Sequence, residues 1–166
     1  MDKGFFSGKN VLVMGLGRFG GGVDVAKFIA GAGAKVIITD LAPAEKLQCS
    51  IDQLKEFLDI EFHLGSHDVS DFEKADVIVV NPAVAPDNDF LEIARRHNKF
   101  ITSQINIFFE LCPATIIGIT GANGKSTTTA LTAHLLRGTR DNGRPRLRLR
   151  LRRGRQTRDE GRENLA

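Results

Sequence analysis

The sequence contains no tryptophan, no tyrosine, only two cysteines and no long apolar run. Cys49 and Cys112 lie far apart without CxxC spacing, which argues against a disulfide framework and a zinc site, so both are interpreted as small buried hydrophobic residues. No stretch approaches the roughly 18 apolar residues of a membrane-spanning helix. The apolar run 11–16 is too short for a secretory signal and is soon followed by Arg18. These absences predict a cytoplasmic protein with no membrane partner.

Acidic residues are in excess over most of the chain, and positive charge is confined to its end. Residues 1–136 carry 12 Lys+Arg against 16 Asp+Glu, whereas residues 137–166 carry 11 arginines, no lysine and 4 acids. The last thirty residues also lack aromatics and have few apolar side chains, so we expect a disordered Arg-rich tail, which an out-of-frame translation explains best. We expect no nucleic-acid partner. The alternative is a nucleotide-binding module whose basic tail grips nucleic acid through phosphate contacts.

Short apolar runs alternate with helical patterns along residues 1–112, which is typical of βαβ units. This region is predicted to be one Rossmann-like α/β domain with a parallel sheet. Strands are expected at residues 10–15, 35–40, 60–64 and 76–81 and at the start of 99–112. Helices are expected after the first strand, over residues 43–58, over residues 89–98 and at the end of 99–112.

A second unit is predicted to begin near Pro113. The run "ATIIGIT" (114–120) resembles a buried strand, and it leads through a glycine loop into a helix over residues 125–136. Thr128, Leu131 and Leu135 are expected to form the inward side of this helix. Residues 113–136 would then be the first strand, P-loop and helix of an incomplete ATPase domain.

The first candidate site is "GLGRFG" (15–20), a complete GxGxxG between a predicted strand and a predicted helix. Glycines there let the backbone approach a diphosphate, whose charge the helix N-terminus stabilises, and Asp40 at the end of the next strand is placed to bind a ribose. A tight βα packing turn is the simpler alternative. The motif leaves open whether the ligand is NAD or another nucleotide diphosphate.

The second candidate site is "TGANGKST" (120–127), which departs from the strict Walker A motif because Ile119 stands at its first glycine. Its backbone amides would cradle phosphate oxygens, Lys125 would reach the β and γ phosphates, and Ser126 would hold Mg²⁺. The motif indicates descent from an ATP site. "HLGSH" places His63 and His67 four apart, but the intervening Gly65 makes a metal-binding helix a poor interpretation.

Two such glycine loops about a hundred residues apart resemble the Mur ligases, and among them the D-glutamate-adding members. The matching stretches are "VLVMGLGRFGGGVDVAKFIAGAGAKVIITD", "HLGSHDVSDFEKADVIVVNPAVAPDNDFL" and "CPATIIGITGANGKSTTTALTAHLL". The resemblance implies an ATP- and Mg²⁺-dependent peptidoglycan ligase that joins D-glutamate to UDP-N-acetylmuramoyl-L-alanine through an acyl phosphate. We expect the chain to be a monomer. Dehydrogenases lack the second loop, which makes an NAD-binding protein the weakest alternative.

The resemblance also implies two sets of site residues. The UDP part of the precursor would be bound by Gly15, Leu16, Gly17, Arg18, Phe19, Gly20, Asp40, Leu41, Asn81, Pro82 and Ala83. ATP would be bound by Gly121, Ala122, Asn123, Gly124, Lys125, Ser126, Thr127 and Thr128, with Lys125 as the catalytic residue and Ser126 as the metal ligand.

The chain departs from the family pattern at three places. Asn81-Pro82-Ala83 replaces a usual Ser-Pro-Gly, and Gln104 and Asn106 replace two usual glutamates. Beyond Leu136 the resemblance ends, so the rest of the ATPase domain and the amino-acid-binding domain have no counterpart. We therefore expect an amino-terminal ligase fragment that is inactive alone.

Overall fold

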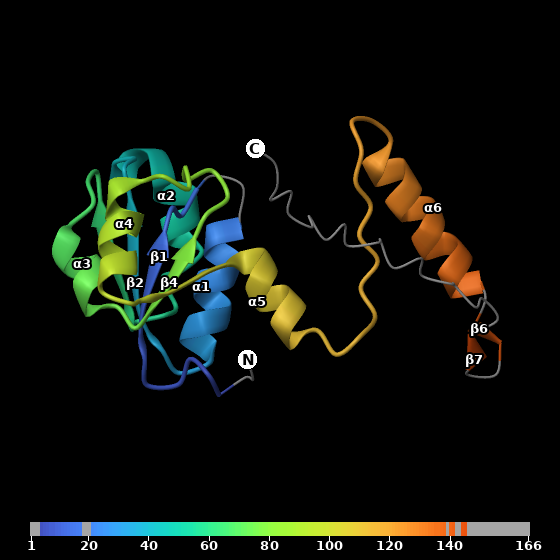
Figure 1. Cartoon of the computed structure of the whole chain (residues 1–166), viewed down its shortest axis with the longest axis horizontal. Helices are drawn as coiled ribbons and strands as arrows, with labels where there is room; N and C mark the ends of the chain where they lie inside the picture. The colour runs from blue at the N-terminus through green and yellow to red at the C-terminus, as the bar shows by residue number, and fades with distance from the viewer. Residues whose placement is uncertain (1–3, 18–20, 139, 142–143, 146–166) are drawn as a thin grey trace, which may run out of the picture. The chain divides into compact units, whose positions relative to one another are not determined.

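The computed structural model describes residues 4–17, 21–138, 140–141 and 144–145 (Figure 1). It divides into two compact units, Met1–Ile116 and Ile117–Ala166, which are described separately. No helix among the described residues is long and apolar enough to cross a membrane.

The first unit is built on a five-stranded sheet with the order β3-β2-β1-β4-β5, in which every neighbouring pair is parallel. The strands are β1 (Asn10–Met14), β2 (Lys35–Asp40), β3 (Ile60–Leu64), β4 (Val77–Val80) and β5 (Phe100–Ser103). The chain runs outward from β1 to β3 and then returns to the other side of β1. The strand order therefore reverses between β1 and β4, and this point is where doubly wound sheets bind ligands.

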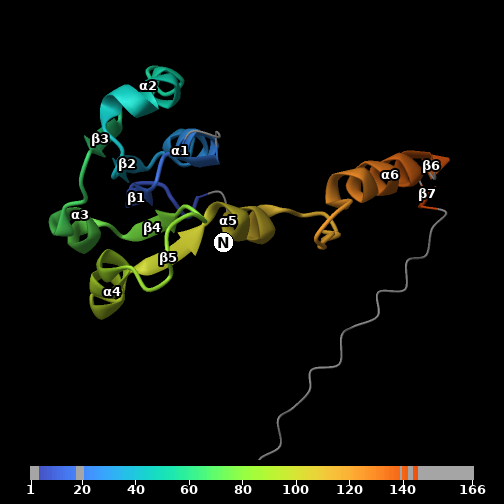
Figure 2. The same ribbon diagram turned by 90° about the horizontal axis from the view of Figure 1, so that it is seen from above.

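Helices cover both faces of the sheet, and Figure 2 shows α1 and α2 on one side with α3 and α4 on the other. The helices are α1 (Gly21–Gly31), α2 (Ala44–Asp52), α3 (Val69–Lys74), α4 (Asp89–Arg96) and α5 (Gln104–Leu111). Ile107 of α5 is buried with the side chains of α1 and α2. The predicted α/β domain with a parallel sheet is thus confirmed.

Strand β1 explains why both layers are needed, because side chains alternate between the two faces of a strand. Val11 and Val13 pack in the core under α1 and α2, whereas Leu12 and Met14 pack in the core under α3 and α4. All four are about 1% exposed. An uninterrupted apolar run is therefore the sequence of a strand buried on both faces.

Several predicted boundaries need correction. Helix α2 ends at Asp52 rather than at residue 58, and residues 53–56 form turns in which Leu54 still fills the core. Helix α4 ends at Arg96, two residues early. The cysteines are free, but Cys49 is exposed and Cys112 is half-buried, so the interpretation of both as buried residues is wrong.

The second unit contains helix α6 (Lys125–Gly138) and a short antiparallel ladder of β6 (Arg140–Asp141) and β7 (Arg144–Pro145). Residues 114–120 form no strand and are largely exposed, which contradicts the predicted buried strand. In the described part of the chain no strand pairs with these residues. An apolar run forms a stable strand only where neighbouring strands hydrogen-bond to it. Leu131 and Leu135 are each 57% exposed, so the predicted inward side of α6 is not buried either. Most of the tail predicted to be disordered lies outside the described residues.

Candidate functional site

A pocket of about 320 Å³ opens at the carboxyl ends of β1, β2 and β4 in the first unit. It is lined by Gly15, Gly17, Asp40, Leu41, His67, Asn81, Ala83 and Val84. Six of these residues were expected from the sequence, whereas His67 and Val84 were not. The structure thus brings the end of the first strand, the end of the second and the Asn-Pro-Ala turn together around one cavity.

The loop after β1 has a backbone that favours glycine. Gly15 and Gly17 have φ values of +91° and +67°, a region that side-chain-bearing residues rarely adopt. A Cβ on Gly15 would lie 2.8 Å from the Cβ of Asn81, so this glycine also permits a close approach of the next strand end. Arg18, Phe19 and Gly20, predicted as ligand-binding residues, lie outside the described residues.

Asp40 holds this loop through its carboxylate. Oδ2 accepts hydrogen bonds from the backbone amides of Leu16 (2.9 Å) and Gly17 (3.2 Å), and Oδ1 accepts one from Ala42 (2.8 Å). Ser50 of α2 adds a bond from its Oγ to the carbonyl oxygen of Gly17 (3.0 Å). The residue placed by sequence to bind a ribose therefore shapes the glycine loop, a role that spacing alone did not reveal.

Asn81 performs a similar function at the end of β4. Its Nδ2 donates to the carbonyl oxygen of Gly15 (3.2 Å), and its Oδ1 accepts from the amide of Ala83 (3.0 Å). Among the described residues that carry a side chain, only Asn98 has a positive φ. Ala83 therefore needs no glycine-like conformation, and the Asn81-Pro82-Ala83 turn tolerates the absence of the usual glycine.

Helix α1 packs unusually close to the loop through Gly22. A Cβ on Gly22 would lie 2.2 Å from the carbonyl oxygen of Leu16 and 2.7 Å from its Cα. The side chain of Leu16 is fully buried in the core, and its part in ligand binding stays a prediction. Pro82 lies beside Gly21 and Gly22 in a neighbouring small cavity. The sequence reasoning overlooked Gly22, which stands two residues beyond the GxGxxG motif.

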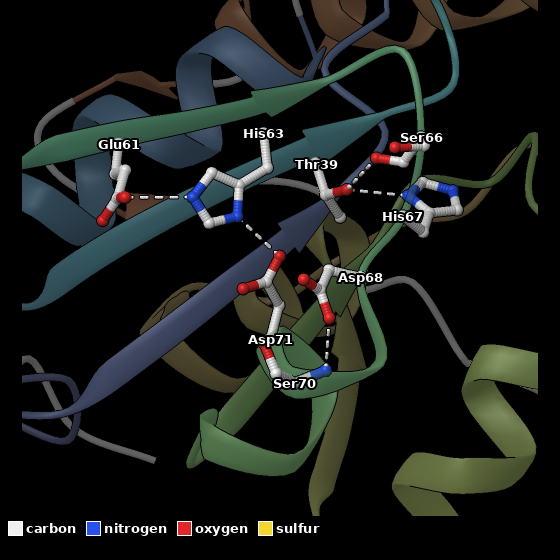
Figure 3. A network of polar contacts seen from close by, with 8 residues as sticks. All are labelled: Thr39, Glu61, His63, Ser66, His67, Asp68, Ser70 and Asp71. Atoms are coloured by element: carbon white, nitrogen blue, oxygen red, sulfur yellow. Dashed lines mark hydrogen bonds and ion pairs between the residues drawn. The ribbon is translucent and has the colours of Figure 1, made fainter.

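His67 joins the pocket from the loop after β3. Its Nδ1 lies 2.7 Å from Thr39 Oγ1, and the same hydroxyl lies 3.4 Å from the carbonyl oxygen of Ser66 (Figure 3). Its ring packs edge-on against Phe72 and Phe90. Burial lowers the pKa of His67 below its ordinary value and outweighs the opposite effects of the Asp40 and Asp71 charges. In the sequence, the feature that could have indicated His67 as a pocket residue is its position in "HLGSH", just after a predicted strand.

His63 forms a separate polar cluster on the other side of this loop (Figure 3). Its Nδ1 lies 2.7 Å from Asp71 Oδ2, and its Nε2 lies 3.0 Å from Glu61 Oε1. The hydrogen bond with Asp71, followed by that with Glu61, raises the pKa of His63 above its ordinary value. Asp71 is 4% exposed, so this pair ties β3 to α3.

The second glycine loop precedes α6. Gly124 has a φ of +76°, and the amide of Thr128 donates to its carbonyl oxygen (2.9 Å) as the helix begins. Lys125 Nζ folds back to the carbonyl oxygens of Gly121 (2.6 Å) and Ala122 (3.1 Å). Residues 121–130 are all exposed. The searched, described residues contain no cluster of three His, Cys, Asp or Glu that could hold a metal.

Together, the strand order, the glycine loop and the pocket at the switch point define a Rossmann-like member of the doubly wound α/β class. The sequence profile described as "Mur ligase MurD-like, N-terminal domain" matches residues 9–103. The chain therefore belongs to the MurD-like Mur ligase family.

Curated relatives agree with this assignment. The chain is 48% identical over 131 residues to a UDP-N-acetylmuramoylalanine--D-glutamate ligase from Roseiflexus sp. (strain RS-1), covering 79% of the chain and 28% of the relative. A protein of the same name from Treponema pallidum (strain Nichols) is 39% identical over 136 residues, covering 81% of the chain and 26% of the relative. The chain thus spans about a quarter of the length of these relatives.

A solved structure supports the fold. The crystal structure of UDP-N-acetylmuramate:L-alanyl-gamma-D-glutamyl-meso-diaminopimelate ligase from Neisseria meningitides matches with a TM-score of 0.50 and 21% identity. The match covers 79% of this chain and 40% of that one. At this level of identity the likeness concerns the fold alone.

Proposed function

We propose that the first unit binds the UDP part of UDP-N-acetylmuramoyl-L-alanine, a precursor of peptidoglycan. The observation that carries the proposal is the pocket in which Gly15, Gly17, Asp40 and Asn81 converge at the topological switch point. Membership of the MurD-like family and the names of the curated relatives support this choice of nucleotide. They favour it over NAD, which the first glycine loop alone would equally suit.

The pocket has the features that a diphosphate needs. Helix α1 begins at Gly21, shortly after Gly15 and Gly17 in the sequence. Free amides and the positive end of the helix dipole stabilise an anion at such a terminus. The uridine would lie on the side of Asp40 and Leu41, beyond the end of β2, because nucleosides in this class extend from the diphosphate toward the second strand.

The second loop is proposed to be the ATP site of the family. Its residues are of the kinds that bind phosphate groups. Gly124 has a left-handed backbone, the Lys125 side chain folds back over the loop, and α6 starts at Lys125. Residues 121–128 would surround the phosphates, with Lys125 neutralising charge and the Ser126 hydroxyl holding Mg²⁺. When bound, ATP supplies the γ-phosphoryl group that activates the precursor's carboxylate.

The reaction of the complete ligase is also a proposal for this chain. The amine of D-glutamate would attack the carbonyl carbon of the acyl phosphate, the carbonyl C–O bond would break to release inorganic phosphate, and an amide bond would form. We propose that this takes place in the cytoplasm, where ATP and nucleotide-linked precursors are made. We propose residues 1–112 as the precursor-binding domain, residues 113–136 as the start of the ATP-binding domain, and a monomeric state. The described residues supply one P-loop lysine and no carboxylate cluster, so turnover would need further ligase sequence.

Calorimetric titration of the 166-residue chain with UDP-N-acetylmuramoyl-L-alanine tests the first step. Gly17→Val should reduce affinity at least tenfold, because valine neither adopts a φ of +67° easily nor leaves the pocket open. Gly8→Val is the matched control, since Gly8 has a φ of +72°, open space around it and a place before β1 at the opposite edge of the sheet. Equal affinity of the Gly17→Val and Gly8→Val variants, or a preference for NADH over the UDP precursor, would contradict the proposal.

A further inference from the structure

The imidazole of His67 is held in one orientation in the wall of the pocket. Figure 3 shows the contact between His67 and Thr39. The Nδ1 and Oγ1 atoms are 2.7 Å apart, and Thr39 is fully buried. The ring lies edge-on to Phe72 and Phe90, with centroid distances of 6.0 and 5.2 Å. A side chain fixed on both its polar and its apolar sides can present its remaining nitrogen in a defined place.

The contact between the ring and the hydroxyl can form in two ways, because either the Thr39 hydroxyl or a protonated Nδ1 can be the donor. The other acceptor open to the hydroxyl proton is the carbonyl oxygen of Ser66, which lies 3.4 Å from Thr39 Oγ1, at the outer limit of a hydrogen bond. Nδ1 lies at 2.7 Å and is the better placed acceptor, so we assign the hydroxyl as the donor. With Nδ1 as the acceptor, a neutral ring carries its proton on Nε2. Among the described residues, Nε2 has no hydrogen-bond partner.

We propose that the Nε2–H of His67 donates a hydrogen bond to an oxygen of the bound uridine nucleotide, and that Thr39 positions the ring for this contact. The inference rests on the proposed function of the pocket and adds a residue to it. Burial lowers the pKa of His67, which favours the neutral ring and hence a single N–H donor over a charged imidazolium. Carbonyl, ribose and phosphate oxygens all satisfy such a donor.

Two amide substitutions separate a ligand contact from a structural role. Glutamine places its side-chain nitrogen near the position of Nε2, whereas asparagine places its amide near Nδ1 and can replace only the Thr39 contact. We expect His67→Leu and His67→Asn to weaken binding of UDP-N-acetylmuramoyl-L-alanine about tenfold, and His67→Gln to stay within about threefold of the unchanged chain. If asparagine restored affinity and glutamine did not, the role of His67 would be structural and the proposal would be overturned. His97→Gln, at an exposed histidine outside the pocket lining, serves as the control.

Titrations with uridine, UMP and UDP locate the ligand oxygen. A tenfold effect of His67→Leu already present with uridine identifies the base or ribose, and an effect that appears only with UMP or UDP identifies a phosphate. Nitrogen-15 NMR of the ring should show the neutral Nε2–H tautomer, with a shift of this nitrogen when UDP is added. A neutral Nδ1–H tautomer would overturn the inference.

The outcomes distinguish this inference from the proposed function. If the chain binds the UDP precursor, Gly17→Val weakens that binding at least tenfold and all His67 variants bind normally, only the His67 contact is refuted. If the unchanged chain does not bind the UDP precursor, the proposed function fails, and the contact fails with it.

Discussion

Gly22→Ala should destabilise the first unit, although alanine is normally the better helix former. The new Cβ would lie 2.2 Å from the Leu16 carbonyl oxygen, whereas such atoms essentially never approach closer than 3.0 Å. The N-terminal part of α1 or the glycine loop would therefore have to retreat by about 0.8 Å. The neighbouring atom is backbone, so no flexible side chain can move aside.

The magnitude follows from two opposing effects. Overpacking a close contact costs about 1–3 kcal/mol, and replacing glycine by alanine inside a helix gains up to about 1 kcal/mol. The net expectation is a loss of about 1–2 kcal/mol in the free energy of unfolding. The same displacement disturbs the 2.9 Å bond from the Leu16 amide to Asp40, so affinity for the UDP precursor should fall as well.

Gly31→Ala is the matched control, because it makes the same substitution in the same helix. A Cβ there meets nothing within 4 Å, so this variant should be stabilised by about 0.4–1 kcal/mol. Urea unfolding should be followed by circular dichroism, since the chain has no tryptophan or tyrosine to report by fluorescence. Two variants of equal stability would refute the close contact between α1 and the loop.

The remaining predictions concern Asp40 and His63. Asp40→Asn should lower the free energy of unfolding by about 1–3 kcal/mol, because a single amide oxygen cannot accept all three backbone bonds. Asp52→Asn, at an exposed carboxylate, is the control and should change stability much less in the same urea assay, whereas equal losses would contradict the role of Asp40. For His63, the raised pKa means that the folded state holds the proton more tightly, so its stabilisation is complete below pH 6.5 and is lost as pH rises through the folded-state pKa. His63→Gln should therefore lose more stability relative to the unchanged chain at pH 6 than at pH 8.5, and a difference independent of pH would disprove this coupling.

The sheet was predictable because its evidence is local. Strand β2 was expected at residues 35–40 and is found at Lys35–Asp40, since a buried strand needs only a short apolar run with turn residues around it. The run 114–120 is also short and rich in β-branched residues, but it forms no strand. Its outcome depends on a pairing partner elsewhere, and local composition cannot supply that information.

The site was predictable only in outline. Glycines in a strand–loop–helix context indicated the position of the pocket, but the roles of Asp40, Gly22 and His67 depend on which atoms meet across 23, 6 and 28 residues of sequence. Such meetings are set by tertiary packing. Spacing identified the correct neighbourhood and not the individual contacts.

The three hydrogen bonds that backbone amides donate to the Asp40 carboxylate affect the energetics of nucleotide binding. A carboxylate built into the fold already occupies two loop amides, Leu16 and Gly17, that a nucleotide anion would otherwise have to organise on arrival. The loop is thus pre-organised, and association loses less conformational entropy than it would with a slack glycine segment. The same internal anion discourages a phosphate from settling on those two amides and leaves the start of α1 as the more favourable seat for negative charge.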